Sequence, residues 1–462
     1  MSWPPGRQRC LSRPLRPFRQ TENILAKILE LNALDLAAIV RPGDTVMWGQ
    51  ADAEPVPLTQ ALMAQRHAIG NFNAFLGITY SDTLKAEYAD CIRFSAYCGT
   101  GGNRALARAG KLDILPCHYS HLSELITSGR LKVDVLMLQL APANERGEYS
   151  LSIAHEYMIP AVATARVVIA EVNERAPWTY GERPLLEADL DYIVHTARPP
   201  LELIHPQPGV AEQAIARNVA ALIEDGATLQ FGLGALPEAI LAQLADRRDL
   251  GVHSGAIGDQ VAALMQAGVI NNARKSIDRG VSVAGIMFGS KRLHDFAHRN
   301  PQLQFRSSAY THAAGVLARI ERFTALNSAV EVDLSGQINA EVAAGVYVGA
   351  VGGAVDFLRA AHYSKGGLPI VALPSTAGKH SRIVAKLNGP VSTPRSDAGL
   401  IVTEYGVADL RGAGLAERER RMLAIAHPDQ REQLERESRI ARGQALALAP
   451  QTKTLVSNTK KR

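Results

Sequence analysis

Residues 43–62 read GDTVMWGQADAEPVPLTQAL, and residues 226–244 read GATLQFGLGALPEAILAQL. The two stretches align with one residue lost in the loop, and the matched pairs are Gly43 with Gly226, Gly49 with Gly232, Pro55 with Pro237, and Leu62 with Leu244. Each copy has a short apolar run, a turn of small residues, a proline, and apolar residues at helical spacing. This order predicts a strand, a tight loop and a helix. The chain is therefore predicted to contain two related α/β units.

Apolar runs alternate with helical patterns on both sides of these stretches, which predicts an open, mostly parallel sheet in each half. The predicted strands are 44–48, 72–79, 91–97, 113–117, 133–140 and 167–172, and then 227–233, 250–254, 281–288, 323–333, 369–373 and 399–403. Residues 21–38 and 415–442 have helical patterns, and the proline-rich stretch 198–209 reads as a linker. We expect a disordered basic tail (1–20), an N-terminal domain (21–205), a C-terminal domain (206–440) and a polar basic tail (441–462).

The net charge of +5 comes from the two ends of the chain. Residues 1–20 contain five arginines and no acid, and residues 453–462 contain four basic residues and no acid, so the rest has a net charge of −4. A basic face for nucleic acid is therefore not expected. No uninterrupted apolar stretch is long enough to span a bilayer. The four cysteines form no C-x-x-C motif, and no secretory signal is evident, so we expect reduced thiols and a cytoplasmic protein.

The loop from Gly232 to Pro237, GLGALP, follows a predicted strand and opens a predicted helix. Glycines let a backbone approach a ligand closely, and free amides at a helix start bind phosphate or an oxyanion. The alternative is a tight turn without a ligand. A dinucleotide site is not expected, because Pro237 replaces the third glycine of G-x-G-x-x-G. The P-loop, G-x-S-x-G and H-E-x-x-H motifs are absent, and the Cys117–His121 segment fits no common zinc spacing, so no metal is expected.

A series of further segments, in order, resembles the acetyl-CoA hydrolase/transferase family, the branch of class I CoA-transferases that includes 4-hydroxybutyrate and butyryl-CoA:acetate enzymes. The segments are AEVNERAPWTYGE (170–182), GLGALP (232–237), GVHSGAIGD (251–259), AGVINNARKS (267–276), FGSKRLHDF (288–296), SGQINAE (335–341), VGGAVDF (351–357) and VTEYGVADLRG (402–412). The resemblance covers roughly residues 21–440. It implies the CoA-transferase fold, catalysis between two similar domains, and no metal or prosthetic group.

One departure from the family pattern concerns the nucleophile. Many members carry a glutamate in a His-Ser/Thr-Glu motif, whereas this chain has His253-Ser254-Gly255. The candidate replacement is Glu54, at a predicted strand end in the first copy of the repeat. Its alternative role is a charge that stabilises a helix N-terminus. The resemblance favours catalysis by Glu54.

Other residues are secondary candidates or candidate ligand contacts. The secondary candidates are Met47, Gln50, His253, Ser254 and Glu404, the last within the family pattern TEYG. The candidate contacts for CoA or the reacting oxyanion are Gly232, Gly234, Gly255, Gly352 and Gly353.

The resemblance implies a CoA-transferase that acts on a short-chain or dicarboxylic acyl-CoA and a carboxylic acid, through a glutamyl intermediate. One alternative is an acyl-CoA hydrolase, in which water enters the same site. Another is a non-catalytic acyl-CoA-binding protein, because Gly255 cannot act as a nucleophile. The expected partners are acyl-CoA, a small acid and further copies of the chain in a homo-oligomer. No cofactor is expected beyond coenzyme A as part of the substrate.

Overall fold

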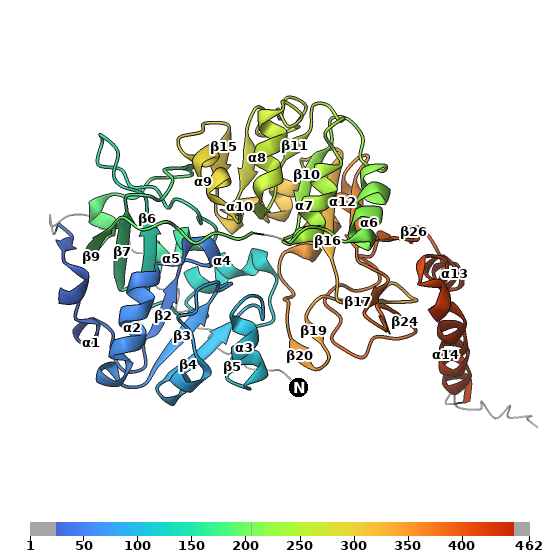
Figure 1. Cartoon of the computed structure of the whole chain (residues 1–462), viewed down its shortest axis with the longest axis horizontal. Coiled ribbons are helices and arrows are strands. Elements are labelled where there is room, and N and C mark those ends of the chain that lie inside the picture. Colours follow the sequence, from blue (N-terminus) through green and yellow to red (C-terminus); the bar gives the residue numbers. More distant parts are fainter. Residues whose placement is uncertain (1–24, 205, 448–462) are drawn as a thin grey trace, which may run out of the picture.

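The computed structural model describes residues 25–204 and 206–447 (Figure 1). The first half forms an eight-stranded sheet in which all neighbouring strands are parallel, in the order β1-β9-β7-β6-β2-β3-β4-β5. Its strands are β1 (Lys27–Ile28), β2 (Thr45–Trp48), β3 (Phe72–Leu76), β4 (Ile92–Ala96), β5 (Leu112–Ile114), β6 (Val135–Leu140), β7 (Val167–Asn173) and β9 (Tyr192–Thr196). Every residue of β6 is buried, as expected for a strand of a parallel sheet covered on both faces.

Helices connect these parallel strands. They are α1 (Leu36–Ile39), α2 (Val56–Ile69), α3 (Asn103–Arg108), α4 (Tyr119–Thr127) and α5 (Met158–Thr164), with 3-10 turns at Leu31–Ala33, Ala51–Ala53, Ala86–Asp90 and Glu187–Asp189. Pro55 precedes α2 and Pro57 lies in its first turn, where a missing N–H has no helical partner to lose. Gly70 ends the helix with a φ of 83°, a conformation that other residues rarely adopt.

The second half has a six-stranded sheet in the order β11-β10-β16-β21-β25-β26, parallel except for the last pair. Its strands are β10 (Thr228–Phe231), β11 (Gly251–Val252), β16 (Phe323–Ser328), β21 (Leu368–Ala372), β25 (Leu400–Thr403) and β26 (Gly406–Asp409). Its helices are α6 (Val210–Ala220), α7 (Ala235–Ala242), α8 (Asp259–Gln266), α9 (Lys291–Ala297), α10 (Ser308–Thr311), α11 (Ala314–Leu317) and α12 (Ala354–Tyr363).

The internal repeat occupies equivalent positions in the two sheets. Strand β2 lies between the next strand in the chain, β3, and the later strand β6, and β10 lies in the same way between β11 and β16. The run β6-β7-β9 then corresponds to β16-β21-β25. Two similar, mostly parallel α/β units are therefore confirmed. The halves differ beyond β3 and β11. In the first sheet β4 and β5 follow β3, whereas the second sheet ends at β11.

Short strands between the main elements form smaller sheets. They are β8 (Tyr180–Gly181), β12 (Ala256–Ile257), β13 (Ser282–Ala284), β14 (Ile286–Met287), β15 (Leu303–Phe305), β17 (Glu331–Asp333), β18 (Ile338–Asn339), β19 (Val342–Ala343), β20 (Val346–Tyr347), β22 (Thr376–Ala377), β23 (His380–Ser381) and β24 (Ile383–Val384). Strand β8 of the first half pairs with β15 of the second half, so one small sheet joins the two units.

Two helices end the described chain, α13 (Leu415–Ile425) and α14 (Pro428–Ala447), and they extend away from the sheets in Figure 1. Helix α14 continues past residue 440, where we had expected the polar tail to begin. The expected basic tail at 1–20 lies outside the described residues. Among the helices that the structure describes, none has the length and apolar character needed to cross a bilayer.

The predicted helix at 21–38 is wrong. Within its described part, Lys27 and Ile28 pair with Tyr192 and Ile193 as an edge strand. Only a 3-10 turn at Leu31–Ala33 and a four-residue α-helix at Leu36–Ile39 follow. Pairing with β9 satisfies backbone groups at the sheet edge, so tertiary context overrides the local helical pattern.

Candidate active site

The two halves face each other through loops that follow parallel strands. After β2, the Asp52 carboxylate accepts a hydrogen bond from the backbone N–H of Gly289 (2.9 Å). After β4, the N–H of Gly99 donates to the carbonyl of Gly349 (2.8 Å). The N–H of Tyr119, at the start of α4, donates to the carbonyl of Gly352 (3.0 Å). Ligands of open α/β sheets bind outside the carboxyl ends of strands, so this interface is the candidate site.

Gln50 lies at the centre of a buried polar network at this interface. Its side-chain oxygen accepts from the Tyr97 hydroxyl (2.8 Å) and the Ile78 N–H (2.7 Å). Its amide nitrogen donates to the Glu156 carboxylate (2.6 Å) and to the Tyr119 hydroxyl (3.0 Å). All four hydrogen-bonding positions of the amide are used, so Gln50 is held in one orientation. The structure therefore shows that Gln50, a secondary candidate, orients the side chains of Glu156, Tyr97 and Tyr119.

Glu156 is the carboxylate that this network surrounds, and our sequence analysis did not single it out. The Tyr119 hydroxyl donates to its second oxygen (2.5 Å). Burial raises the pKa of Glu156 to about 7, despite the hydrogen bonds from Tyr119 and Gln50 that favour its charged form. No motif marks this residue, because it follows β6 in irregular backbone. The only available signal was an acidic residue inside an apolar segment, LSIAHEYMIP (151–160).

The backbone of Glu156 lies beside the glycine that replaces the family glutamate. Its N–H approaches the carbonyl of Gly285 (3.3 Å), and the N–H of Gly285 donates to the carbonyl of Gly255 (2.9 Å). A Cβ on Gly285 would lie 3.4 Å from the Cβ of Glu156. Gly285 therefore connects this segment of the first half to the His253-Ser254-Gly255 segment of the second.

Glu54 is also buried, at 1% exposure, but its carboxylate is held within the first half. One oxygen accepts from the backbone N–H groups of Tyr80 and Ser81, and the other accepts from the Ser81 hydroxyl (2.6 Å). Burial raises its pKa, while these donors and Arg198 act in the opposite direction. The ring of Tyr80 packs edge-on against Phe288 of the second half, with centroids 6.3 Å apart. Tyr80 therefore contacts both Glu54 and the second half, and the catalytic role of Glu54 stays a prediction.

The segment His253–Gly255 is fixed by the strands around it. Ser254 approaches the backbone of Phe231 at the end of β10, with its hydroxyl 3.3 Å from the carbonyl oxygen. His253 contacts the carbonyl of Thr311 through Nε2 (3.1 Å), and burial lowers its pKa to about 3. The neutral imidazole therefore donates to Thr311 and positions the chain that carries His312. In this structure the side chains of His253 and Ser254, both secondary candidates, therefore bond to backbone carbonyl groups.

Two of the candidate glycines converge on His312. A Cβ on Gly255 would lie 2.9 Å from Cε1 of this imidazole, and a Cβ on Gly353 would lie 2.6 Å from Nε2. Gly352 precedes α12 with a φ of 58° and bonds to Tyr119 through its carbonyl. The structure therefore brings together glycines that are almost 100 residues apart in the chain. His312 itself carried no sequence motif.

The loop at Gly232–Gly234 opens between β10 and α7. Gly232 donates to the carbonyl of Leu326 (2.8 Å). Gly234 has a φ of 121°, and no atom lies within 4 Å of the place where its Cβ would be. The space beside this loop is therefore open, and a side chain at Gly234 would be strained. The loop begins next to Ser254, at the same sheet edge as Gly255.

Two secondary candidates, Met47 and Glu404, are not among the residues that meet at His312. Met47 is fully buried within β2, where it pairs with Phe75 and Leu136 in the core. Glu404 follows β25, and its carboxylate accepts from the N–H (2.9 Å) and hydroxyl (2.6 Å) of Ser375. Its described hydrogen bonds all lie within the second half.

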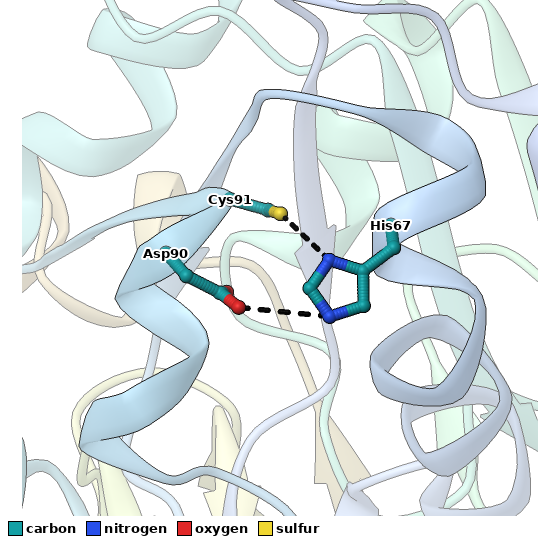
Figure 2. A group of neighbouring side chains, drawn as sticks. All are labelled: His67, Asp90 and Cys91. Atoms are coloured by element: carbon teal, nitrogen blue, oxygen red, sulfur yellow. Dashed lines mark hydrogen bonds and ion pairs between the residues drawn. The ribbon is translucent and has the colours of Figure 1, made fainter.

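A separate cluster of polar side chains lies at the opposite end of the first sheet (Figure 2). Cys91 Sγ is 3.3 Å from Nδ1 of His67, and Asp90 is 3.6 Å from Nε2 of the same ring. One ligand atom from each residue lies within 4.8 Å of the others. The two partners contact opposite nitrogens of one imidazole, and Asp90 also pairs with Arg66. These contacts describe a cluster of hydrogen-bonded and ion-paired side chains at the surface.

Comparison with known proteins identifies relatives along nearly the whole chain. Residues 19–204 match the acetyl-CoA hydrolase/transferase N-terminal domain, and residues 289–438 match the corresponding C-terminal domain. The chain is 39% identical to a 4-hydroxybutyrate coenzyme A transferase of Clostridium kluyveri, over 84% of this chain and 92% of that protein. An acetyl-CoA hydrolase of Yarrowia lipolytica is more distant, at 24% identity over 80% of each chain.

Solved structures show the same fold. RipA from Yersinia pestis superposes with a TM-score of 0.85 at 30% identity, covering 90% of this chain and 98% of that one. The 4-hydroxybutyrate CoA-transferase from Porphyromonas gingivalis superposes with a TM-score of 0.75 at 33% identity, with the same coverage.

Proposed function

Because the chain belongs to the acetyl-CoA hydrolase/transferase family, we propose that it is a CoA-transferase. It moves CoA between a short-chain or dicarboxylic acyl-CoA and a carboxylic acid. The observation that carries the proposal is the meeting of Gly255, Gly353 and His312 against Tyr119 of the first half, together with the buried carboxylates of Glu54 and Glu156. The open space beside Gly234 gives a thioester room to approach, and a carboxylate supplies the group that such a reaction needs.

The proposed reaction uses a glutamyl intermediate. A glutamate carboxylate attacks the thioester carbonyl carbon, the carbon–sulfur bond breaks, and CoA leaves as a thiolate. The thiolate then attacks the glutamyl carbonyl of the resulting anhydride and releases the first acid. A second acid reverses these steps and leaves with CoA. A carboxylate is a weak nucleophile, so orientation and oxyanion stabilisation supply most of the acceleration.

We assign the glutamyl role to Glu54, as the sequence predicts. Its burial supports the assignment, because a raised pKa makes the ionised carboxylate a stronger base and nucleophile. To react, the carboxylate must exchange at least one of its hydrogen bonds to Tyr80 and Ser81 for the thioester. Backbone amides near Gly232, Gly234 and Gly255 are the proposed oxyanion donors. The proposal includes a cytoplasmic protein, a homo-oligomer, and no partner beyond acyl-CoA and acid.

Transfer is distinguished from hydrolysis by the dependence on an acceptor. The protein is incubated with acetyl-, succinyl- or butyryl-CoA, with and without a panel of short carboxylic acids. Transfer predicts little release of free CoA without an acceptor, and rapid formation of a new acyl-CoA with one. Equal release of free CoA in both conditions would show a hydrolase. Binding without any turnover would show a non-catalytic acyl-CoA-binding protein.

A further inference from the structure

A histidine, an aspartate and a cysteine meet at the end of the first sheet that lies away from the candidate active site. His67 is in the last turn of α2, and Asp90 and Cys91 immediately precede β4. Figure 2 shows the side chains of Asp90 and Cys91 on the same side of the imidazole ring. The three side chains come from two separate segments, so a group bound by all of them would join the end of α2 to the start of β4.

The distances between these side chains suit a small metal ion. Sγ of Cys91 lies 3.3 Å from Nδ1 of His67, close to the separation of about 3.5 Å that a sulfur and a nitrogen ligand have on tetrahedral zinc. One potential ligand atom from each of the three residues lies within 4.8 Å of the others. The side chains of His67 and Asp90 are 63% and 41% exposed, and their last torsions have broad preferences. Small rotations therefore bring all three ligand atoms around one ion.

The imidazole and the carboxylate each have an atom to offer to the ion. A metal bound to Nδ1 of His67 requires the hydrogen of the neutral ring to be on Nε2, which lies 3.6 Å from Oδ2 of Asp90. Oδ1 of Asp90 accepts from Nε of Arg66 (3.3 Å), so Oδ2 remains available to the metal. Such an outer hydrogen bond orients a ligating carboxylate.

The types of ligand favour zinc over the common hard cations. Thiolate and imidazole groups suit Zn²⁺, whereas Mg²⁺ and Ca²⁺ prefer oxygen ligands. His67 lies at the carbonyl end of α2, where the helix dipole favours a positive charge. Asp90 and Cys91 also line a surface hollow of about 690 Å³, which leaves room for a water molecule as the fourth ligand.

We propose that His67, Asp90 and Cys91 form a binding site for Zn²⁺, with water as the fourth ligand. Cys91 binds as the thiolate, so its proton passes to the solvent when the ion binds. The ion stabilises this end of the first sheet, because its ligands come together only in the folded chain. The sequence did not indicate the site, since His67 and Cys91 are 24 positions apart and this spacing fits no common zinc motif. The site is independent of the proposed CoA transfer.

Cobalt(II) tests the site, because it occupies tetrahedral zinc sites and its absorption reports the ligands. The full-length, reduced protein is titrated with Co²⁺ alone. A thiolate ligand gives a sulfur-to-cobalt charge-transfer band in the near ultraviolet, and added Zn²⁺ should remove that band. Cys91→Ser should abolish the band. His67→Gln and Asp90→Asn should each weaken Zn²⁺ binding by about 100-fold or more, beyond the loss typical of an outer-shell partner.

Cys117→Ser is the matched control. Cys117 is also partly buried, and it is followed in the chain by a histidine, so it offers an alternative thiolate next to an imidazole. This variant should keep the charge-transfer band and the wild-type affinity for Zn²⁺. Thermal unfolding gives a second readout: Zn²⁺ should raise the Tm of the wild-type protein and of Cys117→Ser, but not that of Cys91→Ser.

Three outcomes would overturn the zinc site. They are the absence of a charge-transfer band in the wild-type protein, equal Zn²⁺ affinities of the wild-type protein and Cys91→Ser, and loss of the band in Cys117→Ser. Neither readout involves acyl-CoA. Absence of CoA transfer would therefore overturn the proposed function and leave the decision on the zinc site to the metal titration.

Discussion

Glu54 shows how hydrogen bonding constrains a buried carboxylate. Its oxygens face two backbone N–H groups and one hydroxyl, all of them donors. A glutamine can keep both backbone bonds through its one oxygen, while its NH₂ group donates to the Ser81 hydroxyl, which then accepts instead of donating. Glu54→Gln replaces charge-assisted hydrogen bonds with neutral ones and should lower stability by about 1 kcal/mol.

The same variant should also lose CoA transfer by several orders of magnitude, because an amide cannot form the anhydride. Turnover per folded molecule, with stability measured by thermal unfolding, separates the two effects. Glu404→Gln serves as the comparison, since its carboxylate also accepts from a backbone N–H and a hydroxyl. Normal turnover in folded Glu54→Gln would exclude it as the acyl carrier.

Glu156 should make stability depend on pH. Burial raises its pKa from an ordinary value of 4.5 to about 7, in a surrounding of Gln50, Tyr97, Tyr119 and Tyr157. Between these pH values the folded protein holds a proton that the unfolded chain has lost. Its contribution is therefore most favourable near the lower value and falls as the pH rises toward 7.

Glu156→Gln removes this titration and keeps a polar side chain of the same size. The difference in unfolding free energy, variant minus wild type, should therefore increase from about pH 5 to about pH 8, by an amount on the order of one or more kcal/mol, and the difference in Tm should increase with it. Thermal unfolding at both pH values measures it. A difference that is constant across this range would show that Glu156 titrates normally.

At the scale of secondary structure, the loop before α7 has a glycine, Gly234, at positive φ with open space beside it. Gly234→Val places a β-branched side chain at a φ of 121° and fills the region where we expect acyl-CoA. Such strain costs about 1–3 kcal/mol, and acyl-CoA affinity should fall more than this loss of stability explains.

Gly110→Val is the control for this loop. Gly110 also has a positive φ, of 65°, with no atom within 4 Å of its Cβ position, and it lies in the turn before β5. Acyl-CoA binding by calorimetry, beside thermal unfolding, compares the two variants. If both folded variants bind with wild-type affinity, the loop has only a structural role.

Most main strands were predictable because each is an apolar run bounded by turn residues. Strands β2, β6 and β10 fall within their predicted ranges, and the repeat placed β2 and β10 in equivalent sheet positions. Elements that depend on distant partners were missed. Strand β1 forms only because β9 lies beside it, and β8 only because β15 does. Local periodicity contains no information about such pairings.

The candidate site was predictable in part, for a related reason. Gly255 stands out in the sequence because it replaces the glutamate of the family pattern, and Gly353 because it lies in a glycine-rich stretch that leads into a helix. Glu156 and His312 do not, since each becomes informative only when the fold brings it beside those glycines. The roles of Gln50 and His253 also needed the structure, which shows that both bond to protein groups.

At the scale of the whole molecule, the hydrophobic core of the described residues extends across both halves. Its largest cluster includes Phe75 and Leu138 of the first sheet and Leu229 and Val252 of the second. Hydrogen bonds also cross the interface, including Ser120 to Asp356 (2.9 Å). Halves that are joined in this way should lose their structure together.

We therefore expect a single unfolding transition, with a calorimetric enthalpy equal to the van't Hoff enthalpy if the unfolding is reversible. Scanning calorimetry tests this directly. Ser120→Ala removes one bridge between the halves and should lower the temperature of that transition without splitting it. Two separate transitions in the wild-type protein would show that the halves are independent folding units.

The contact between Gly255 and His312 also constrains how the sequence can change. A glutamate introduced at position 255 would meet the imidazole at 2.9 Å, so it requires a smaller residue at position 312 first or at the same time. A smaller residue at 312 alone would leave an unfilled space between Tyr119 and Phe357. The two positions are therefore epistatic. Each single change is unfavourable, so the double change has to pass through a less stable intermediate. This obstacle helps to keep Gly255 and His312 together in the sequence.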